Sequence, residues 1–294
     1  MIFGKTFSMP LARSAIFAAT IATCVAIAAP VQAQSAGVDD VVAPQLTYAD
    51  LADLSDAATI VVKAQIRRQV QLEPERAPGL KPGFVRLYIE AETLYLLTGN
   101  APIGESLRYL VDVPLDSRGK PPKLKKQDML LFARTVPGRP GELGLVGPGA
   151  QQPWSEALEA RLRPILAELV QADSPAAVTG VRDAISVAGN LAGESETQIF
   201  LSTTDGTPVS LAIIRRPGMT PVWGVSWSDI VDQAARPPEA GTLRWYRLAC
   251  FLPDTIPASA NLSRDSESRT RAAQDYRLVL QQLGTCERSL RRPQ

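Results

Sequence analysis

The first half of the fold is decided by residues 85–97, Val-Arg-Leu-Tyr-Ile-Glu-Ala-Glu-Thr-Leu-Tyr-Leu-Leu. The odd positions from Val85 to Thr93 are apolar or β-branched, whereas Arg86, Tyr88, Glu90 and Glu92 fill the even positions. Successive side chains of a strand point to opposite faces. The alternation therefore predicts a half-buried strand with its odd positions turned inward.

Further strands are predicted on both sides of this one. Their residues are 59–66, 107–113, 128–133 and 143–146, and a Pro- and Gly-rich stretch at 73–83 marks a long loop. A short helix is expected at 48–54. Four or five short antiparallel strands suit a small closed barrel, which we assign to residues 46–150.

Three stretches of this region carry a resemblance to small exported bacterial proteins with an OB-like barrel. Ser55-Asp56 precedes a buried strand, a Leu-rich step ends at Gly99, and Asp128–Ala133 forms a late apolar strand. The resemblance covers about residues 50–135, and Lys63-Ala64 stands where such barrels usually carry a Gly. The similar proteins are uncharacterised, so the resemblance implies a fold and no activity.

The second half predicts a linking helix followed by an α+β domain. Ser155 is a suitable N-cap for a helix over 154–172, within a linker of residues 151–174, and Pro164 should kink the helix or end its first half. Its predicted inward side chains are Leu158, Leu162, Ile165, Leu166, Leu169 and Val170. In the domain of residues 175–294, the expected strands are 178–187, 196–203, 208–216 and 222–226, and the expected helices are 229–235, 242–252 and 264–283, with a strand as the alternative for 242–252. The whole chain is thus expected to be α+β.

The N-terminus has the pattern of an export signal. Lys5 and Arg13 precede an apolar run, and Val31-Gln32-Ala33 fits a cleavage site. We predict a signal peptide at residues 1–33, a disordered lead-in at 34–45, and a mature protein in the periplasm or outside the cell, with no membrane span. A retained membrane helix, or lipidation at Cys24, is the alternative.

The two cysteines after the signal, Cys250 and Cys286, predict a disulfide that joins two helix ends. The alternative is a pair of free or redox-active thiols, but such pairs usually sit close in sequence.

The absence of histidine excludes several chemistries. The chain of 294 residues contains none, which removes Ser-His-Asp and Cys-His catalysis and imidazole-ligated metals. We expect no metal and no cofactor. The net charge of +1 gives no electrostatic case for nucleic acid as a partner.

Two groups of residues are candidate binding sites. The first is a basic loop that contains Lys120, Lys123, Lys125 and Lys126, which could contact an acidic partner or instead be a solvated loop. The second is an aromatic group that contains Trp223, Trp227 and Trp245, which could line a glycan or peptide groove or instead belong to the core.

Catalytic patterns are weak. Ser117 and Lys120 have the Ser-x-x-Lys spacing, but Gly119 and Pro121 oppose the helix that this chemistry needs. Acidic pairs at 90/92 and 194/196 are more typical of a solvated strand face or loop than of a glycosidase site. We assign no catalytic residue.

These observations favour an exported, non-catalytic binding or interaction module of the cell envelope, whose partner is an unidentified envelope protein or glycan. The alternatives are a histidine-free hydrolase or transferase that uses Ser, Lys or carboxylates, and a structural subunit of the envelope. Enzymatic activity stays open.

Overall fold

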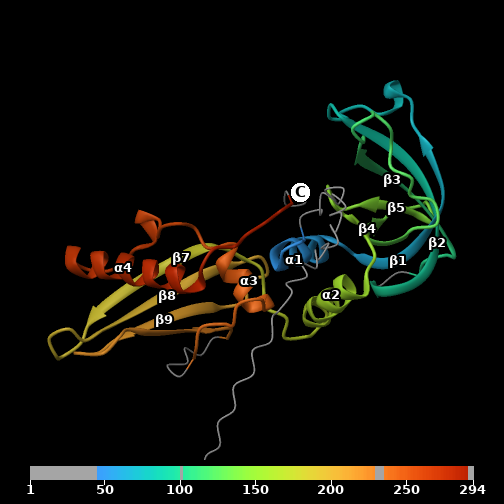
Figure 1. The fold of residues 1–294 in the computed structure, drawn as a ribbon. Coiled ribbons are helices and arrows are strands. Elements are labelled where there is room, and N and C mark those ends of the chain that lie inside the picture. The colour runs from blue at the N-terminus through green and yellow to red at the C-terminus, as the bar shows by residue number, and fades with distance from the viewer. Residues whose placement is uncertain (1–44, 100–101, 229–234, 291–294) are drawn as a thin grey trace, which may run out of the picture. The chain divides into compact units, whose positions relative to one another are not determined.

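A computed structural model describes residues 45–99, 102–228 and 235–290. The predicted signal peptide, the lead-in up to residue 44 and nearly all of the predicted helix 229–235 lie outside the described residues. The chain from Pro44 onward forms one compact unit. Its architecture is α+β, as the sequence predicts, and within the described residues it consists of a closed barrel, a second sheet and four helices (Figure 1).

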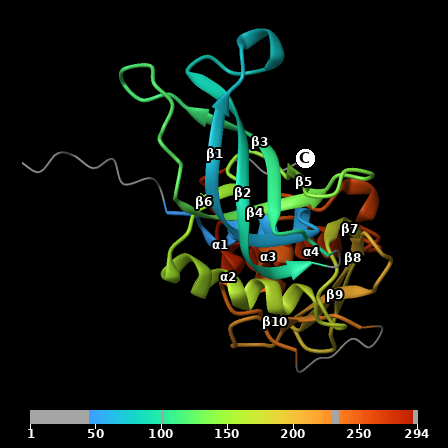
Figure 2. The ribbon, with the colours of Figure 1, turned by 90° about the vertical axis from the view of Figure 1, so that its right-hand side faces the viewer.

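The first sheet closes into a barrel. Its strands are β1 (Ile60–Gln71), β2 (Phe84–Gly99), β3 (Ser106–Pro114), β4 (Asp128–Thr135), β5 (Glu142–Leu145) and β6 (Gln151–Pro153). They pair in the order β1-β2-β3-β5-β4-β6, and β1 also pairs with β4, which closes a ring of five strands. The β1–β2 connection, which includes the short 3-10 helix η1 (Pro74–Arg76), projects beyond the barrel (Figure 2).

The barrel is mixed, which corrects our expectation of a purely antiparallel one. Four of its contacts are antiparallel, but β3 and β5 run parallel. The reason is geometric, because strand directions cannot alternate all the way around a closed ring that has an odd number of strands. The parallel contact is also the shortest, with only Arg108↔Glu142 and Tyr109↔Leu143 in register.

The inward face of β2 is the predicted one. Val85, Leu87, Ile89 and Ala91 are buried in the barrel core, together with apolar side chains from β1, β3, β4 and β5. Beyond Ala91 the alternation ends, and Thr93 is only half-buried. Shifts of the β1–β2 register before Val62 and Ala64 accompany this change.

Three helices share a second core with the outer side of the barrel. They are α1 (Tyr48–Ala57), α2 (Glu156–Leu169) and α3 (Leu243–Ala249). The predicted N-cap Ser155 accepts a hydrogen bond from the Leu158 N–H at 3.1 Å. The prediction that Val170 packs inward is wrong, because α2 ends before it and its side chain is 70% exposed.

The second sheet is antiparallel, in the order β10-β9-β8-β7. Its strands are β7 (Val178–Ala188), β8 (Ser195–Thr203), β9 (Val209–Arg215) and β10 (Val222–Ser226). Helix α4 (Ser266–Leu283) lies along one face, as Figure 1 shows, and contributes Tyr276, Val279 and Leu283 to a third core. The 3-10 helix η2 (Ala258–Ala260) precedes it.

A disulfide and the hydrogen bonds of residues 288–290 to α1 hold the C-terminal segment. We call residues 288–290 the polar strap. Cys250, the C-cap of α3, is bonded to Cys286, which follows α4, as predicted. Beyond the disulfide, the Ser289 hydroxyl and the Leu290 N–H donate to the Asp50 carboxylate of α1 at 2.6 and 3.0 Å. The Arg288 guanidinium donates to Asp53 at 2.6 Å.

The helices of the described part of the chain include none that combines the length and apolar character needed to cross a bilayer.

Candidate functional site

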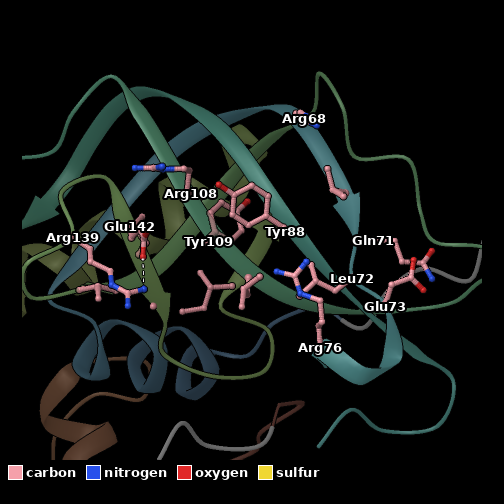
Figure 3. Close-up of a pocket in the computed structure, with 16 residues that line it drawn as sticks. Arg68, Gln71, Leu72, Glu73, Arg76, Tyr88, Arg108, Tyr109, Arg139 and Glu142 are labelled. Atoms are coloured by element: carbon pink, nitrogen blue, oxygen red, sulfur yellow. Dashed lines mark hydrogen bonds and ion pairs between the residues drawn. The ribbon is translucent and has the colours of Figure 1, made fainter. Parts of the chain in front are cut away.

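A pocket of about 920 Å³ opens on the outer side of the barrel. It lies over β2, β3 and β5, between the β1–β2 connection and the β4–β5 connection (Figure 3). Its charged side chains are Arg68, Arg76, Arg108, Arg139, Glu73 and Glu142. We call it the arginine pocket.

The four arginines come from separate parts of the chain. Arg68 is on β1, Arg76 is in η1, Arg108 is on β3, and Arg139 lies in the β4–β5 turn. All four side chains are exposed. In Figure 3 the Arg76 guanidinium points from the β1–β2 connection toward the ring of Tyr88, whereas the Arg139 guanidinium lies beside Glu142.

Two of these arginines have a carboxylate partner and two do not. Arg139 pairs with Glu142 at 3.3 Å, and Arg68 pairs with Glu90 at 3.4 Å. Within the described part of the chain, no ion pair or side-chain hydrogen bond engages Arg76 or Arg108. Arg108 lies in register with Glu90 of β2 and Glu142 of β5 without an ion pair to either. The four arginines outnumber the two glutamates of the lining, so the pocket carries a net positive charge that could bind an anionic group.

The floor of the pocket is apolar and aromatic. The pairing of the strands places Val70, Tyr88 and Leu110 side by side across β1, β2 and β3. Val70 is 39% exposed and Leu110 is 47% exposed. Such a row offers a surface against which the ring or stem of a ligand can pack while the arginines hold its charges.

Tyr109 supports this floor from inside the barrel. Its side chain is buried, and its hydroxyl donates to Oε1 of Gln151 at 2.7 Å. Burial raises the pKa of Tyr109, so this residue stays neutral and acts as a fixed hydrogen-bond donor.

The β4–β5 turn needs a glycine to complete the pocket. Gly141 has a φ of +78°, and a Cβ there would lie 2.9 Å from the carbonyl oxygen of Ser106. The carbonyl oxygen of Gly141 accepts the backbone N–H of Arg108 at 2.8 Å. This contact fixes the turn that carries Arg139 against β3.

The four lysines of the predicted basic loop lie in the β3–β4 connection and are exposed. The carboxylate of Asp116 accepts the backbone N–H of Lys120 at 2.8 Å, and the buried side chain of Leu124 anchors the loop to the barrel core. Lys123, Lys125 and Lys126 also belong to this loop, and none of the four lines the arginine pocket. The loop stays a separate predicted contact surface.

The three tryptophans do not gather in one open groove. Trp223 is only 4% exposed, and its indole N–H donates to Gln282 at 2.7 Å. Trp245 is half-buried and donates to the carbonyl oxygen of Leu283 at 2.8 Å. Trp227 is half-buried and packs against the same core. Their surroundings are those of core residues, which was the alternative interpretation.

The residues in and around the weak catalytic patterns take part in other hydrogen bonds. Asp116 accepts the N–H groups that follow it in the chain, so Ser117 and Lys120 belong to a turn and not to a helix. Glu92 accepts from Arg67 at 2.6 Å, and Glu194 accepts the N–H of Asn190 at 3.1 Å. Among the residues that the structure describes, no group of three or more acidic or cysteine side chains could hold a metal ion.

Sequence reasoning missed the arginine pocket because its cations are distant in the chain. The only local signal was the alternation of β2 and β3, which turns Tyr88 and Arg108 outward. Comparison with known proteins adds no candidate, because neither a protein-family model nor a curated protein matches the chain. The fold and the pocket alone thus define the class as a barrel protein with a basic, aromatic-floored pocket.

Proposed function

We propose that the protein is an exported, non-catalytic binding module of the cell envelope that holds an anionic ligand in the arginine pocket. The observation that carries the proposal is that four arginines from separate parts of the chain line one pocket with Tyr88, and that Arg76 and Arg108 have no ion pair among the described residues. The export signal pattern at residues 1–33 and the Cys250–Cys286 disulfide support the location.

We further propose that the barrel is OB-like, as the resemblance of residues 50–135 implies. The strand order β1-β2-β3-β5-β4, closed by the β1–β4 pairing, supports this assignment. Barrels of this kind bind extended polymers over the face of strands 2 and 3 and the adjoining loops. The arginine pocket occupies the corresponding face, so an extended anionic ligand such as an acidic glycan suits it best.

The test is a binding titration of the purified protein with three defined probes: a sulfated hexasaccharide, inorganic tripolyphosphate and an oligoglutamate. We expect the hexasaccharide to bind, and more weakly at high salt because salt screens exposed charges. In a variant with Arg76→Glu and Arg108→Glu, affinity should fall by at least about tenfold, which corresponds to about 1.4 kcal/mol.

The matched control is Arg277→Glu, which reverses an equally exposed arginine on α4. A second arm combines Lys123→Glu with Lys125→Glu and tests the predicted basic loop. The proposal is wrong if no probe binds, or if the Arg76/Arg108 variant binds as tightly as the control. Loss of affinity only in the lysine variant would show that the ligand binds the basic loop and not the arginine pocket.

A further inference from the structure

The short contact between β3 and β5 leaves part of β3 unpaired. β5 is in register with Arg108 and Tyr109 only, so within the described residues the stretch Leu110–Pro114 has no strand on that side. A slot of about 550 Å³ opens there. Its walls are Leu110–Pro114 on one side and Leu145 with Gly147–Gln151 on the other. We call it the β3 slot.

The free edge of β3 carries main-chain hydrogen-bonding groups that face this slot. The N–H of Arg108 donates to the carbonyl oxygen of Gly141 on the β5 side. Because the N–H and C=O groups of a strand alternate in direction, those of Asp112 point to the same side. Pro114 has no N–H, so the usable edge ends there.

The side chains around the β3 slot are mostly apolar. Phe84 is 38% exposed and Leu110 is 47% exposed. The Arg86 guanidinium is engaged by Asp112, with bonds of 2.6 and 2.8 Å, and this contact raises the pKa of Arg86. The remaining cation of the lining is Lys81, which is exposed and has no carboxylate partner among the described residues.

We propose that the β3 slot binds an extended segment of a partner protein, which adds to the edge of β3 as a further strand. An extended peptide is the ligand that can pair with the main chain of Asp112 and also pack apolar side chains on Phe84 and Leu110. A carboxylate of the peptide pairs with Lys81, the uncompensated cation. About four residues, roughly 13 Å of strand, fill the edge.

The experiment uses the full protein and a library of synthetic octapeptides with four β-branched central residues and one terminal Asp. Binding is read by hydrogen exchange at the amide of Asp112. We expect selected peptides to protect this amide. We also expect two series of peptides, N-methylated at the odd or at the even positions, to differ in binding. Methylation should abolish binding in the series whose methylated groups face β3 and leave it nearly unchanged in the other, because only one set of N–H groups faces β3.

Two protein variants complete the test. Lys81→Glu should lower the affinity for peptides that end in Asp by about tenfold and raise the affinity for peptides that end in Lys. The control Lys123→Glu lies outside the slot and should change neither affinity. The two sites share the side chains of Leu110 and Leu145. The Arg76→Glu, Arg108→Glu variant leaves these side chains and the edge of β3 in place, so it should keep peptide binding while it loses the anionic ligand.

The proposal is overturned if no library peptide protects Asp112 at millimolar concentration, or if both N-methylated series bind equally. Protection of Asp112 that grows with protein concentration in the absence of peptide would also overturn it, because a second copy of the chain would then occupy the slot.

Discussion

Asp275 of α4 is a fully buried charge whose neighbours lie on the adjacent sheet. Its carboxylate accepts from Nε of Arg215 at 2.6 Å and from the Thr197 hydroxyl at 2.5 Å. The Arg215 side chain is 30% exposed, but Thr197 is fully buried, and removing the carboxylate leaves both donors without this acceptor. We expect Asp275→Ala to lower the free energy of unfolding by about 3 kcal/mol, measured by urea denaturation.

The same sheet offers a control for this substitution. Asp183 pairs with Arg182 at 2.9 Å on the exposed side of β7. Exposed pairs contribute about 0–1 kcal/mol, so Asp183→Ala should change the free energy of unfolding by less than that. Equal losses in the two variants would show that Asp275 does not act through its burial.

The carboxyl group of Asp50 predicts how the stability of the protein changes in acid. Burial alone would raise the pKa of this carboxyl, but the hydrogen bonds from the Ser289 hydroxyl and the Leu290 N–H outweigh burial and lower it. A lowered pKa means that the contribution to stability is complete above the unfolded value of about 4 and is lost as the pH falls. The thermal midpoint should therefore drop in acid, and less so in Asp50→Asn.

The measurement is the midpoint of thermal unfolding over the range from about pH 6 to pH 2, which brackets the unfolded pKa of Asp. Asp173→Asn serves as the comparison, because Asp173 is exposed. If Asp50→Asn and Asp173→Asn follow the same acid curve, the strap does not depend on the Asp50 charge.

At the scale of elements, α2 contains a residue that should weaken it. Pro164 lies inside the helix on its exposed side, where it cannot donate a hydrogen bond to the preceding turn. Pro164→Ala should raise the free energy of unfolding by about 1–3 kcal/mol, which calorimetry would detect. An unchanged stability would mean that Pro164 does not weaken the helix in its present packing.

Elements were predictable from the sequence where the deciding signal is local. The N-cap Ser155 and the alternation around Ile89 each act within a few residues, and the structure contains the corresponding helix and strand. The alternative of a strand at 242–252 is excluded by α3, a helix that Thr242 caps through a bond of 3.2 Å from the Trp245 N–H.

Pairings between distant segments were not predictable in this way. The parallel β3–β5 contact depends on how the whole ring closes, and no spacing in the sequence encodes it. The arginine pocket has the same origin, because Arg68 and Arg139 reach the lining of one pocket only after closure. For Trp223, Trp227 and Trp245 the limit is different, because composition alone does not distinguish a binding groove from a core.

At the scale of the whole molecule, the disulfide holds the polar strap in place. Cys250 and Cys286 are 36 residues apart, and closing such a loop is worth about 4 kcal/mol in the chain-entropy model. Replacing both cysteines with Ser should lower stability by about that amount and accelerate hydrogen exchange at Ser289 and Leu290. Unchanged exchange at these amides would show that the strap binds α1 without the disulfide.

The strap also has a consequence for the order in which the chain is made. Asp50 is synthesised early and accepts hydrogen bonds from Thr47, but its other donors lie 239 and 240 residues later. Helix α1 therefore cannot complete its contacts until the chain has been made as far as Ser289 and Leu290. In a chain that stops before Ser289, the Asp50 carboxylate would keep only its hydrogen bonds from Thr47, so the first helix would lose its link to the C-terminal segment.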